Sequence, residues 1–287
     1  YLVEPGREPR PVKREPDWFD AEGMAIRQYE AISADGTRVP YFVVTPKAFK
    51  ADGSAPTVLY GYGGFEVPLL PRYNGTTGSA WLERGGVWVL ANIRGGGEFG
   101  PAWHSAVLQE NRHKVYEDFI AVAEDLVARR ITSARRLGIM GGSQGGLLVG
   151  ATTMMRPELF SAAVSQVPLL DMKRYNKLLA GASWMAEYGD PDDPAQWDTI
   201  RRWSPYQLLD KEADYPEMFF WTTTRDDRVH PGHARKMVAK MRSQGHPVLY
   251  YERVEGGHGS GSTNAQRANN AALEWAYLWM KLGGSEP

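Results

Sequence analysis

Short apolar runs alternate with helical patterns through most of this chain, and this alternation restricts the fold more than any other feature. Runs typical of strands are TVLYGY, GVWVLANI, RLGIMG, SAAVSQV, MFFWTTT and PVLYYERV. Apolar residues at helical spacing occupy 116–129, 145–155, 233–245 and 264–282. Such alternation indicates parallel strands joined by crossover helices, with both faces of the sheet covered. We therefore predict an α/β fold with a mostly parallel, doubly wound sheet.

Three segments depart from this alternation. Residues 1–16 are rich in proline and arginine and indicate a linker or tail, so we place one folded domain at 17–287. Two alternating apolar runs around an Asp-Gly pair predict a β-hairpin within 24–46. Residues 171–215 are rich in Trp, Tyr, Asp and Pro and separate two predicted core strands. They are expected to form an inserted cap or a substrate-binding segment.

Composition excludes several classes of function. The net charge of −1 gives no general attraction to nucleic acid or to an anionic membrane. The absence of cysteine excludes disulfides, thiolate metal sites and a cysteine nucleophile. No apolar run approaches the ~18 residues needed to span a bilayer, and the chain does not open on a signal-like segment. We expect a soluble protein, cytoplasmic or periplasmic, whose start at Tyr1 suggests processing or a longer parent chain.

The glycine-rich segment GIMGGSQGGLLVG, residues 138–150, contains the most informative chemical motif. Ser143 stands between two glycine pairs, after a predicted buried strand and before a predicted helix. This is the context of a G-x-S-x-G nucleophile elbow, where small neighbours permit a strained turn and the helix N-terminus favours a developing anion. The alternative is a structural glycine-rich loop. The strand before and the helix after favour the nucleophile, and with it an α/β-hydrolase fold.

A serine nucleophile needs a base, and six histidines are candidates. His258 lies in a glycine-rich loop between the last strand and the closing helix, where the order Ser, Asp, His of an α/β-hydrolase places the base. His104 and His113 precede the elbow, which is the wrong order. The H-x-x-H pair has no evident third metal ligand, and the remaining histidines are expected at the surface: His230, His233 and His246.

The acid and the oxyanion donors are expected at the ends of other strands. Asp226 and Asp227 both follow a predicted strand; one would orient the base, and spacing alone does not choose between them. The backbone amide of Gln144 would be one oxyanion donor because it directly follows the nucleophile. The second donor should come from YGYGGFE, residues 60–66. Tyr62 in that loop either supplies a hydroxyl or is an ordinary packed tyrosine.

Six segments, YGYGGF, ANIRGGGEFGPAWH, GGSQGGLLV, RPELFSAAVSQVPLLDM, DDRV and GGHGSG, resemble in this order the catalytic domain of the prolyl oligopeptidase family of serine peptidases. The resemblance runs from about residue 20 to the end of the chain. Carried over by position, Ser143 resembles the nucleophile, Asp226 the acid and His258 the base. Tyr62 resembles the hydroxyl donor to the oxyanion, beside the Gln144 amide.

The same resemblance implies a pocket for proline. Trp184 is expected to stack on the pyrrolidine ring, and an apolar aromatic slot suits such a flat, uncharged ring. Arg228 resembles the arginine that binds a substrate carbonyl on the acyl side of the scissile bond. No carboxylate stands at the matched positions, which argues against the related oligopeptidases that cleave after Arg or Lys. The implied pocket lining is Phe65, Leu169, Trp184, Tyr188 and Val229.

Two substitutions and one absence separate this chain from the family pattern. Gln144 stands where prolyl oligopeptidase has Asn, which should matter little if only the amide acts, and Leu169 replaces Val and narrows the pocket slightly. Nothing in the chain resembles the β-propeller that covers the active site in family members. We expect that partner domain in the same parent protein; otherwise the chain acts without it.

The function implied by the resemblance is a serine peptidase that cleaves oligopeptides after proline through an acyl-enzyme. A peptide is the expected substrate, and no metal or organic cofactor is implied. The first alternative is an open-site esterase or acyl-peptide hydrolase of the same fold. The second is a catalytically silent binding domain, against which the intact Ser, Asp, His and Tyr argue.

Overall fold

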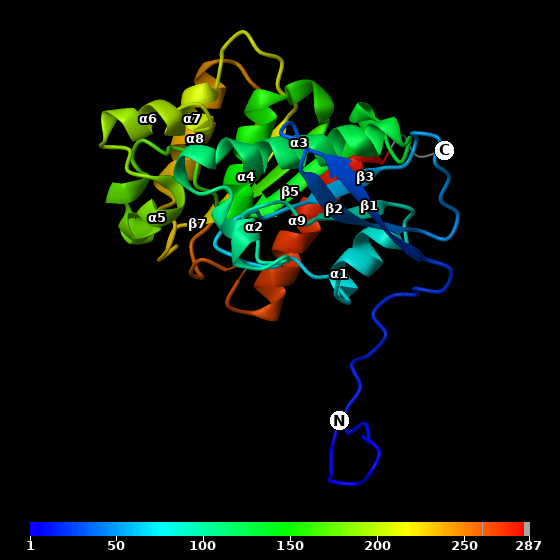
Figure 1. Ribbon diagram of the computed structural model, residues 1–287. Helices are drawn as coiled ribbons and strands as arrows, with labels where there is room; N and C mark the ends of the chain where they lie inside the picture. The colour runs from blue at the N-terminus through cyan, green and yellow to red at the C-terminus, as the bar shows by residue number, and fades with distance from the viewer. Residues whose placement is uncertain (260, 284–287) are drawn as a thin grey trace.

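The computed structural model describes residues 1–259 and 261–283, and its centre is one eight-stranded sheet (Figure 1). The strands lie in the order β1-β2-β4-β3-β5-β6-β7-β8. The pairs β1–β2 and β2–β4 are antiparallel, and each pair from β4 to β8 is parallel. The strands are β1 (Ala25–Ile32), β2 (Arg38–Thr45), β3 (Thr57–Tyr60), β4 (Val87–Ala91), β5 (Leu137–Gly142), β6 (Ala162–Gln166), β7 (Met218–Thr223) and β8 (Val248–Arg253).

Four longer helices pack on this sheet, and their ends carry recognisable signals. The last one starts with a capping box, in which Thr263 Oγ1 accepts from the Gln266 N–H and the Gln266 side chain accepts from the Thr263 N–H. Gly245 follows the helix Gly232–Ser243 and has a φ of +87°, the left-handed conformation in which many helices end. The helices are α3 (His113–Ala128), α4 (Gln144–Met155), α8 (Gly232–Ser243) and α9 (Asn264–Leu282).

Successive residues of the strands enter two separate hydrophobic clusters, one on each face of the sheet. On β7, Met218 and Phe220 belong to the cluster that contains the buried residues of α3, α4 and α8. Phe219 and Trp221 belong to the cluster that contains those of α9. In Figure 1, α3 and α9 accordingly lie on opposite sides of the sheet. Both faces are covered, as the pattern of a doubly wound sheet predicts.

The segment predicted as an insertion, 171–215, forms short helices between β6 and β7. These are η5 (Tyr175–Lys177), η6 (Leu179–Trp184), α5 (Met185–Tyr188), α6 (Pro194–Ile200) and α7 (Pro205–Leu208). The other short helical turns are α1 (Gly75–Thr77), η1 (Gly78–Leu82), α2 (Pro101–Ser105), η2 (Gln109–Asn111), η3 (Ala134–Arg136) and η4 (Pro157–Leu159).

The N-terminal segment differs from the rest of the chain. Residues 1–16 are exposed throughout and contain no strand or helix beyond an isolated bridge between Leu2 and Arg10. In Figure 1 this segment extends away from the domain. At the other end of the predicted domain, residues 284–287 lie outside the part of the chain that the structure describes.

Candidate active site

Ser143 occupies a strained turn between β5 and α4. Its φ of +58° and ψ of −114° lie in a region that non-glycine residues rarely adopt, at a cost of about 1–3 kcal/mol. Its N–H donates to the carbonyl oxygen of Gln166, the last residue of β6, at 2.8 Å. A Cβ on Gly141 would lie only 2.4 Å from the carbonyl oxygen of Gly145. The turn therefore requires the small neighbours that the elbow motif provides.

Three side chains from distant parts of the chain form one hydrogen-bonded row. His258 Nε2 lies 2.8 Å from Ser143 Oγ, and His258 Nδ1 lies 2.8 Å from Asp226 Oδ2. The Asp226 side chain is fully buried, whereas the His258 side chain is 16% exposed. Because an ionised carboxylate only accepts hydrogen bonds, Asp226 holds the proton on Nδ1 and leaves Nε2 to accept the serine proton.

The two aspartates that spacing could not separate make different contacts. Asp226 Oδ1 accepts the backbone N–H groups of Arg228 and Val229 at 2.9 and 2.8 Å, which fixes the carboxylate that faces the imidazole. Asp227 Oδ1 instead accepts the backbone N–H of His258 at 3.2 Å. Asp226 therefore contacts the ring of the candidate base, and Asp227 contacts its loop.

Tyr62 and Gln144 meet beside the elbow. Burial raises the pKa of the Tyr62 hydroxyl, and interactions with Ser143 and the Arg228 charge oppose this rise only in part, so the hydroxyl stays protonated near neutrality. The Gln144 N–H belongs to the first turn of α4, where backbone donors lack partners within the helix. The Gln144 side chain donates to the carbonyl oxygens of Tyr62 and Gly63, both at 3.3 Å. This glutamine thus holds the loop as well as offering an amide.

The residues expected to bind proline include three aromatic rings in edge contact. The ring centroids of Phe65 and Trp184 are 6.5 Å apart at 74°, and those of Phe65 and Tyr188 are 5.6 Å apart at 88°. Tyr188 is buried and donates its hydroxyl proton to Gln144 Oε1 at 2.5 Å, while Phe65 and Trp184 are half-buried. The remaining expected residues are buried Leu169 and Val229, and exposed Arg228.

A buried ionic group next to these rings was missed by the sequence interpretation. Glu187 Oε1 accepts from Arg112 Nη1 at 2.7 Å and from the Phe65 N–H at 3.0 Å. Glu187 Oε2 lies 2.7 Å from His104 Nε2. A carboxylate does therefore lie beside the aromatic rings, although fully buried Arg112 balances its charge. No local pattern identifies this pair, because its members stand 75 residues apart.

The expectation that His233 lies at the surface is wrong. Its side chain is buried because α8 packs against the chain that follows β6, and Nδ1 accepts the backbone N–H groups of Leu170 and Asp171 at 3.3 and 3.1 Å. Burial lowers the pKa of His233 to about 4, so the ring is neutral near pH 7. His230 and His246 are both half-buried rather than fully at the surface. His230 Nδ1 accepts the Gly232 N–H at 2.9 Å, and His246 Nε2 lies 2.9 Å from the Asp210 carbonyl oxygen.

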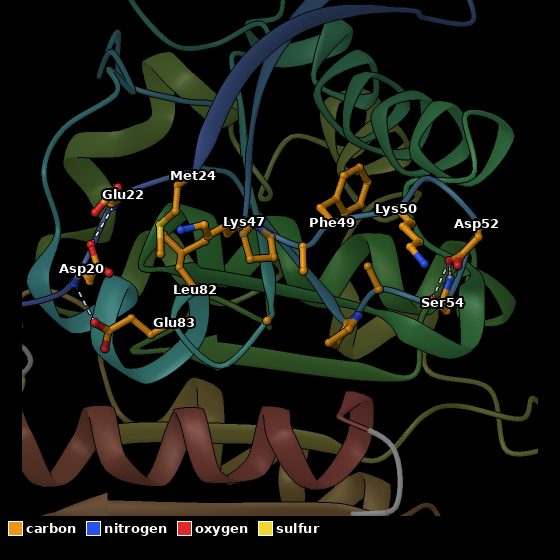
Figure 2. A pocket seen from close by; sticks show the side chains of 15 residues that line it. Asp20, Glu22, Met24, Lys47, Phe49, Lys50, Asp52, Ser54, Leu82 and Glu83 are labelled. Carbon is orange, nitrogen blue, oxygen red and sulfur yellow. Dashed lines mark hydrogen bonds between the residues drawn. The ribbon is translucent and has the colours of Figure 1, made fainter.

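A groove of about 790 Å³ lies at the amino ends of the parallel strands β3 and β4 (Figure 2). Its lining includes Pro56, just before β3, and Gly85, just before β4, whereas the candidate site lies beyond the carboxyl ends of the parallel strands. Its charged side chains carry both signs, with Lys47, Lys50 and Asp52 among them. The groove is thus separate from the Ser143 site.

Within 1–259 and 261–283, no group of three or more His, Cys, Asp or Glu side chains is placed to hold a metal ion. Among the helices of those residues, none combines the length and the apolar character needed to cross a bilayer.

Serine, aspartate and histidine follow one another along the chain in the order found in α/β-hydrolases, and the elbow occupies the corresponding turn after β5. The chain has an α/β-hydrolase fold. A sequence profile described as "Prolyl oligopeptidase family" matches residues 73–285. The chain belongs to the prolyl oligopeptidase family.

Similar proteins include the "Uncharacterized peptidase y4nA" of Sinorhizobium fredii, which is 53% identical over 267 residues, 93% of this chain and 37% of that protein. The "Prolyl endopeptidase" of Elizabethkingia miricola is 39% identical over 252 residues, 86% of this chain and 36% of its own. A solved post-proline cleaving enzyme from Rickettsia typhi matches with a TM-score of 0.90 and 41% identity, over 92% of this chain and 38% of that one. The chain thus spans little more than a third of these relatives.

Proposed function

We propose that this chain is the catalytic domain of a serine peptidase that hydrolyses oligopeptides on the carboxyl side of proline. The observation that carries the proposal is the hydrogen-bonded row from Ser143 through His258 to Asp226, next to a cluster of aromatic rings. The printed names of two relatives, a prolyl endopeptidase and a post-proline cleaving enzyme, support the substrate class.

The proposed reaction passes through an acyl-enzyme. Ser143 Oγ attacks the scissile carbonyl carbon while His258 Nε2 takes the hydroxyl proton. The protonated imidazole, held and stabilised by Asp226, then gives that proton to the nitrogen of the leaving amine as the C–N bond breaks. Water attacks the resulting ester in the second half, with His258 again as base, and releases the peptide acid and the free serine.

Two donors are proposed for the oxyanion. The Tyr62 hydroxyl is a protonated donor next to Ser143, and the Gln144 N–H lies at the start of α4 directly after the nucleophile. Each such donor contributes about 10²–10³ in kcat in related chemistry, because it acts on charge that develops only in the transition state.

The proposed pocket is apolar, with Phe65, Trp184 and Tyr188 around the proline ring. Leu169 and Val229 complete its walls, and Arg228 binds a substrate carbonyl on the acyl side. Because Arg112 neutralises the charge of Glu187, this carboxylate does not attract a basic side chain into the pocket. The pocket therefore favours an uncharged side chain.

The proposed partner is a β-propeller domain of the same parent protein. This chain spans 37% of y4nA, which leaves ample length in a protein of that size for a second domain. Such a propeller would cover the site and admit only short peptides.

Labelling with an active-serine phosphonate, followed by rates on two substrates, tests the proposal. The intact protein should be labelled on Ser143, and Ser143→Ala should lose labelling and lower turnover by about 10⁴–10⁶-fold while remaining folded. A peptide amide with proline on the acyl side should be cleaved between proline and the next residue. Retention of more than about a tenth of the turnover by Ser143→Ala would reject the nucleophile, and hydrolysis of an aryl ester without any of the peptide would favour the esterase alternative.

A further inference from the structure

The loop that carries Tyr62 is held in a conformation that it would not adopt alone. Gly63, Phe65 and Glu66 have φ values of +68°, +56° and +57°, and two of these are non-glycine residues in the left-handed region. Such backbone persists only where surrounding groups determine it. The groups that contact this loop therefore decide where the Tyr62 hydroxyl lies.

Arg112 and Glu187 each form a hydrogen bond with the backbone of this loop. Arg112 Nη2 donates to the Gly63 carbonyl oxygen at 2.8 Å, and Glu187 Oε1 accepts the Phe65 N–H at 3.0 Å. Arg112 Nη1 also donates to the same Glu187 oxygen at 2.7 Å, which joins the two side chains in an ion pair. The two backbone groups belong to the residues on either side of Gly64, one and three positions after Tyr62, so the ion pair holds the loop close to the proposed oxyanion donor.

The space between the pair and the loop is filled. A Cβ at Gly64 would lie 2.8 Å from Gln144 Cγ, 2.9 Å from Arg112 Nη2 and 3.1 Å from Glu187 Oε1. The Arg112 side chain is fully buried and the Glu187 side chain is 5% exposed. A shift of either charged group is therefore transmitted to the loop, because each contacts the loop backbone directly within a closely packed region.

We propose that Arg112 and Glu187 are a positioning pair that sets the Tyr62 hydroxyl for oxyanion stabilisation. This inference rests on the proposed peptidase function, and it explains what holds the Tyr62 hydroxyl of that site in position. Neither residue is catalytic, because both act through the backbone of residues 63–65. His104, from α2, steadies the carboxylate at its second oxygen, with Nε2 2.7 Å from Glu187 Oε2.

A double-mutant cycle with residue 62 separates positioning from general stabilisation. Glu187→Gln is expected to lower kcat on a proline peptide about tenfold when residue 62 is Tyr. In the Tyr62→Phe background the same change should cost less than about twofold, because the hydroxyl that the pair positions is already gone. The measurements use the intact protein well below its unfolding temperature.

A matched control comes from a second buried ion pair. Arg94 Nη2 lies 2.6 Å from Asp118 Oδ1, and these side chains are 5% and 0% exposed. Asp118→Asn should lower the thermal midpoint, and its effect on kcat should be the same with Tyr or Phe at position 62. Dependence on residue 62 in the Glu187 variant but not in the Asp118 variant supports positioning.

Removing one partner of a buried ion pair is strongly destabilising, so a milder variant accompanies Glu187→Gln. The His104 side chain is 19% exposed, and His104→Gln perturbs the same carboxylate from its other side. Its loss of kcat should also depend on residue 62, and this test decides the matter if Glu187→Gln does not fold.

Equal losses in both backgrounds, or a silent Tyr62→Phe, would overturn the inference. Ser143→Ala, measured in parallel, keeps the two proposals distinct. An active Ser143→Ala rejects the peptidase mechanism itself, whereas an inactive one with an additive cycle rejects only the positioning pair.

Discussion

The backbone N–H of His258 donates to Asp227 Oδ1, while the imidazole of the same residue contacts Asp226 Oδ2. Two adjacent aspartates therefore act on different parts of one histidine. Asp226 is buried and faces the ring, whereas Asp227 is exposed and faces the loop. A third contact to this loop comes from Thr223, the last residue of β7, whose Oγ1 donates to the Gly257 carbonyl oxygen at 2.8 Å. The loop is thus held by β7 and by the turn that follows it.

This division predicts unequal effects of two matched substitutions. Asp226→Asn should lower kcat by about 10⁴-fold, because the amide no longer stabilises the charged imidazole or selects its tautomer. Asp227→Asn should cost far less, because an asparagine oxygen still accepts the His258 N–H. Steady-state rates on a proline peptide, with circular dichroism as a check on folding, measure both. The reverse ranking would show that Asp227 is the acid.

Tyr62→Phe is predicted to lower kcat by about 10²–10³-fold with a smaller change in KM, because the missing hydroxyl acts on charge present only in the transition state. Kinetics on the proline peptide provide the measurement. Phosphonate labelling of Ser143 should still occur in this variant, although more slowly. An unchanged kcat would assign the second oxyanion donor to a backbone amide instead.

The parts of the fold that the sequence predicted well are those with local causes. The closing helix was predicted at 264–282 and found there, since its apolar residues recur at helical spacing. In the structure a capping box at Thr263 fixes its start. The strands were placed to within one or two residues, because each is a short apolar run between polar segments. Helix α3 begins at His113, three residues before the predicted 116, because its first two residues, His113 and Lys114, are polar and do not show the apolar spacing.

The candidate site divides in the same way. Ser143 and His258 each stand in a local glycine-rich context between a strand and a helix, so the residues themselves indicate where they lie. The contact between Arg112 and Glu187 has no such signature, because it arises only when α5 packs beneath the loop after β3. The burial of His233 likewise depends on how α8 meets the chain after β6, which the H-x-x-H spacing does not encode.

The burial of the Glu274 carboxyl on α9 leads us to predict that the stability of the protein depends on pH. Burial raises the pKa of this carboxyl from its ordinary 4.5 to about 7, although the Trp221 and Gln166 side chains donate to it. Between these two values the unfolded chain has lost the proton and the folded chain keeps it. Raising the pH through this window therefore favours unfolding, and the free energy of unfolding falls until the pH exceeds about 7.

Glu274→Gln should remove this contribution while keeping an oxygen acceptor for the Trp221 indole. Relative to wild type, the variant should gain on the order of 3 kcal/mol in free energy of unfolding at about pH 8, and little at about pH 5. Urea denaturation at both pH values measures the difference. A gain of the same size at both would mean that Glu274 ionises normally in the folded protein.

The last prediction concerns substrate choice and rests on Trp184, at the end of η6. The proline ring is apolar and rigid, and the indole face together with Phe65 and Tyr188 would enclose it. Trp184→Ala removes much of that wall, and a lost aromatic contact of this kind is worth roughly 2–4 kcal/mol. We therefore expect kcat/KM for a proline peptide to fall by about tenfold or more. An activated ester with a small acyl group does not fill the pocket and should lose much less.

Trp197 on α6 offers a matched control, because it belongs to the same insertion and packs on the same core but is not among the proposed pocket residues. Trp197→Ala should lower the thermal midpoint and leave the ratio of the two rates close to that of the wild type. A Trp184 variant that behaves like the Trp197 variant, with equal losses on peptide and ester, would make Trp184 a packing residue of the insertion. That outcome would remove the main support for a proline pocket and favour a general esterase.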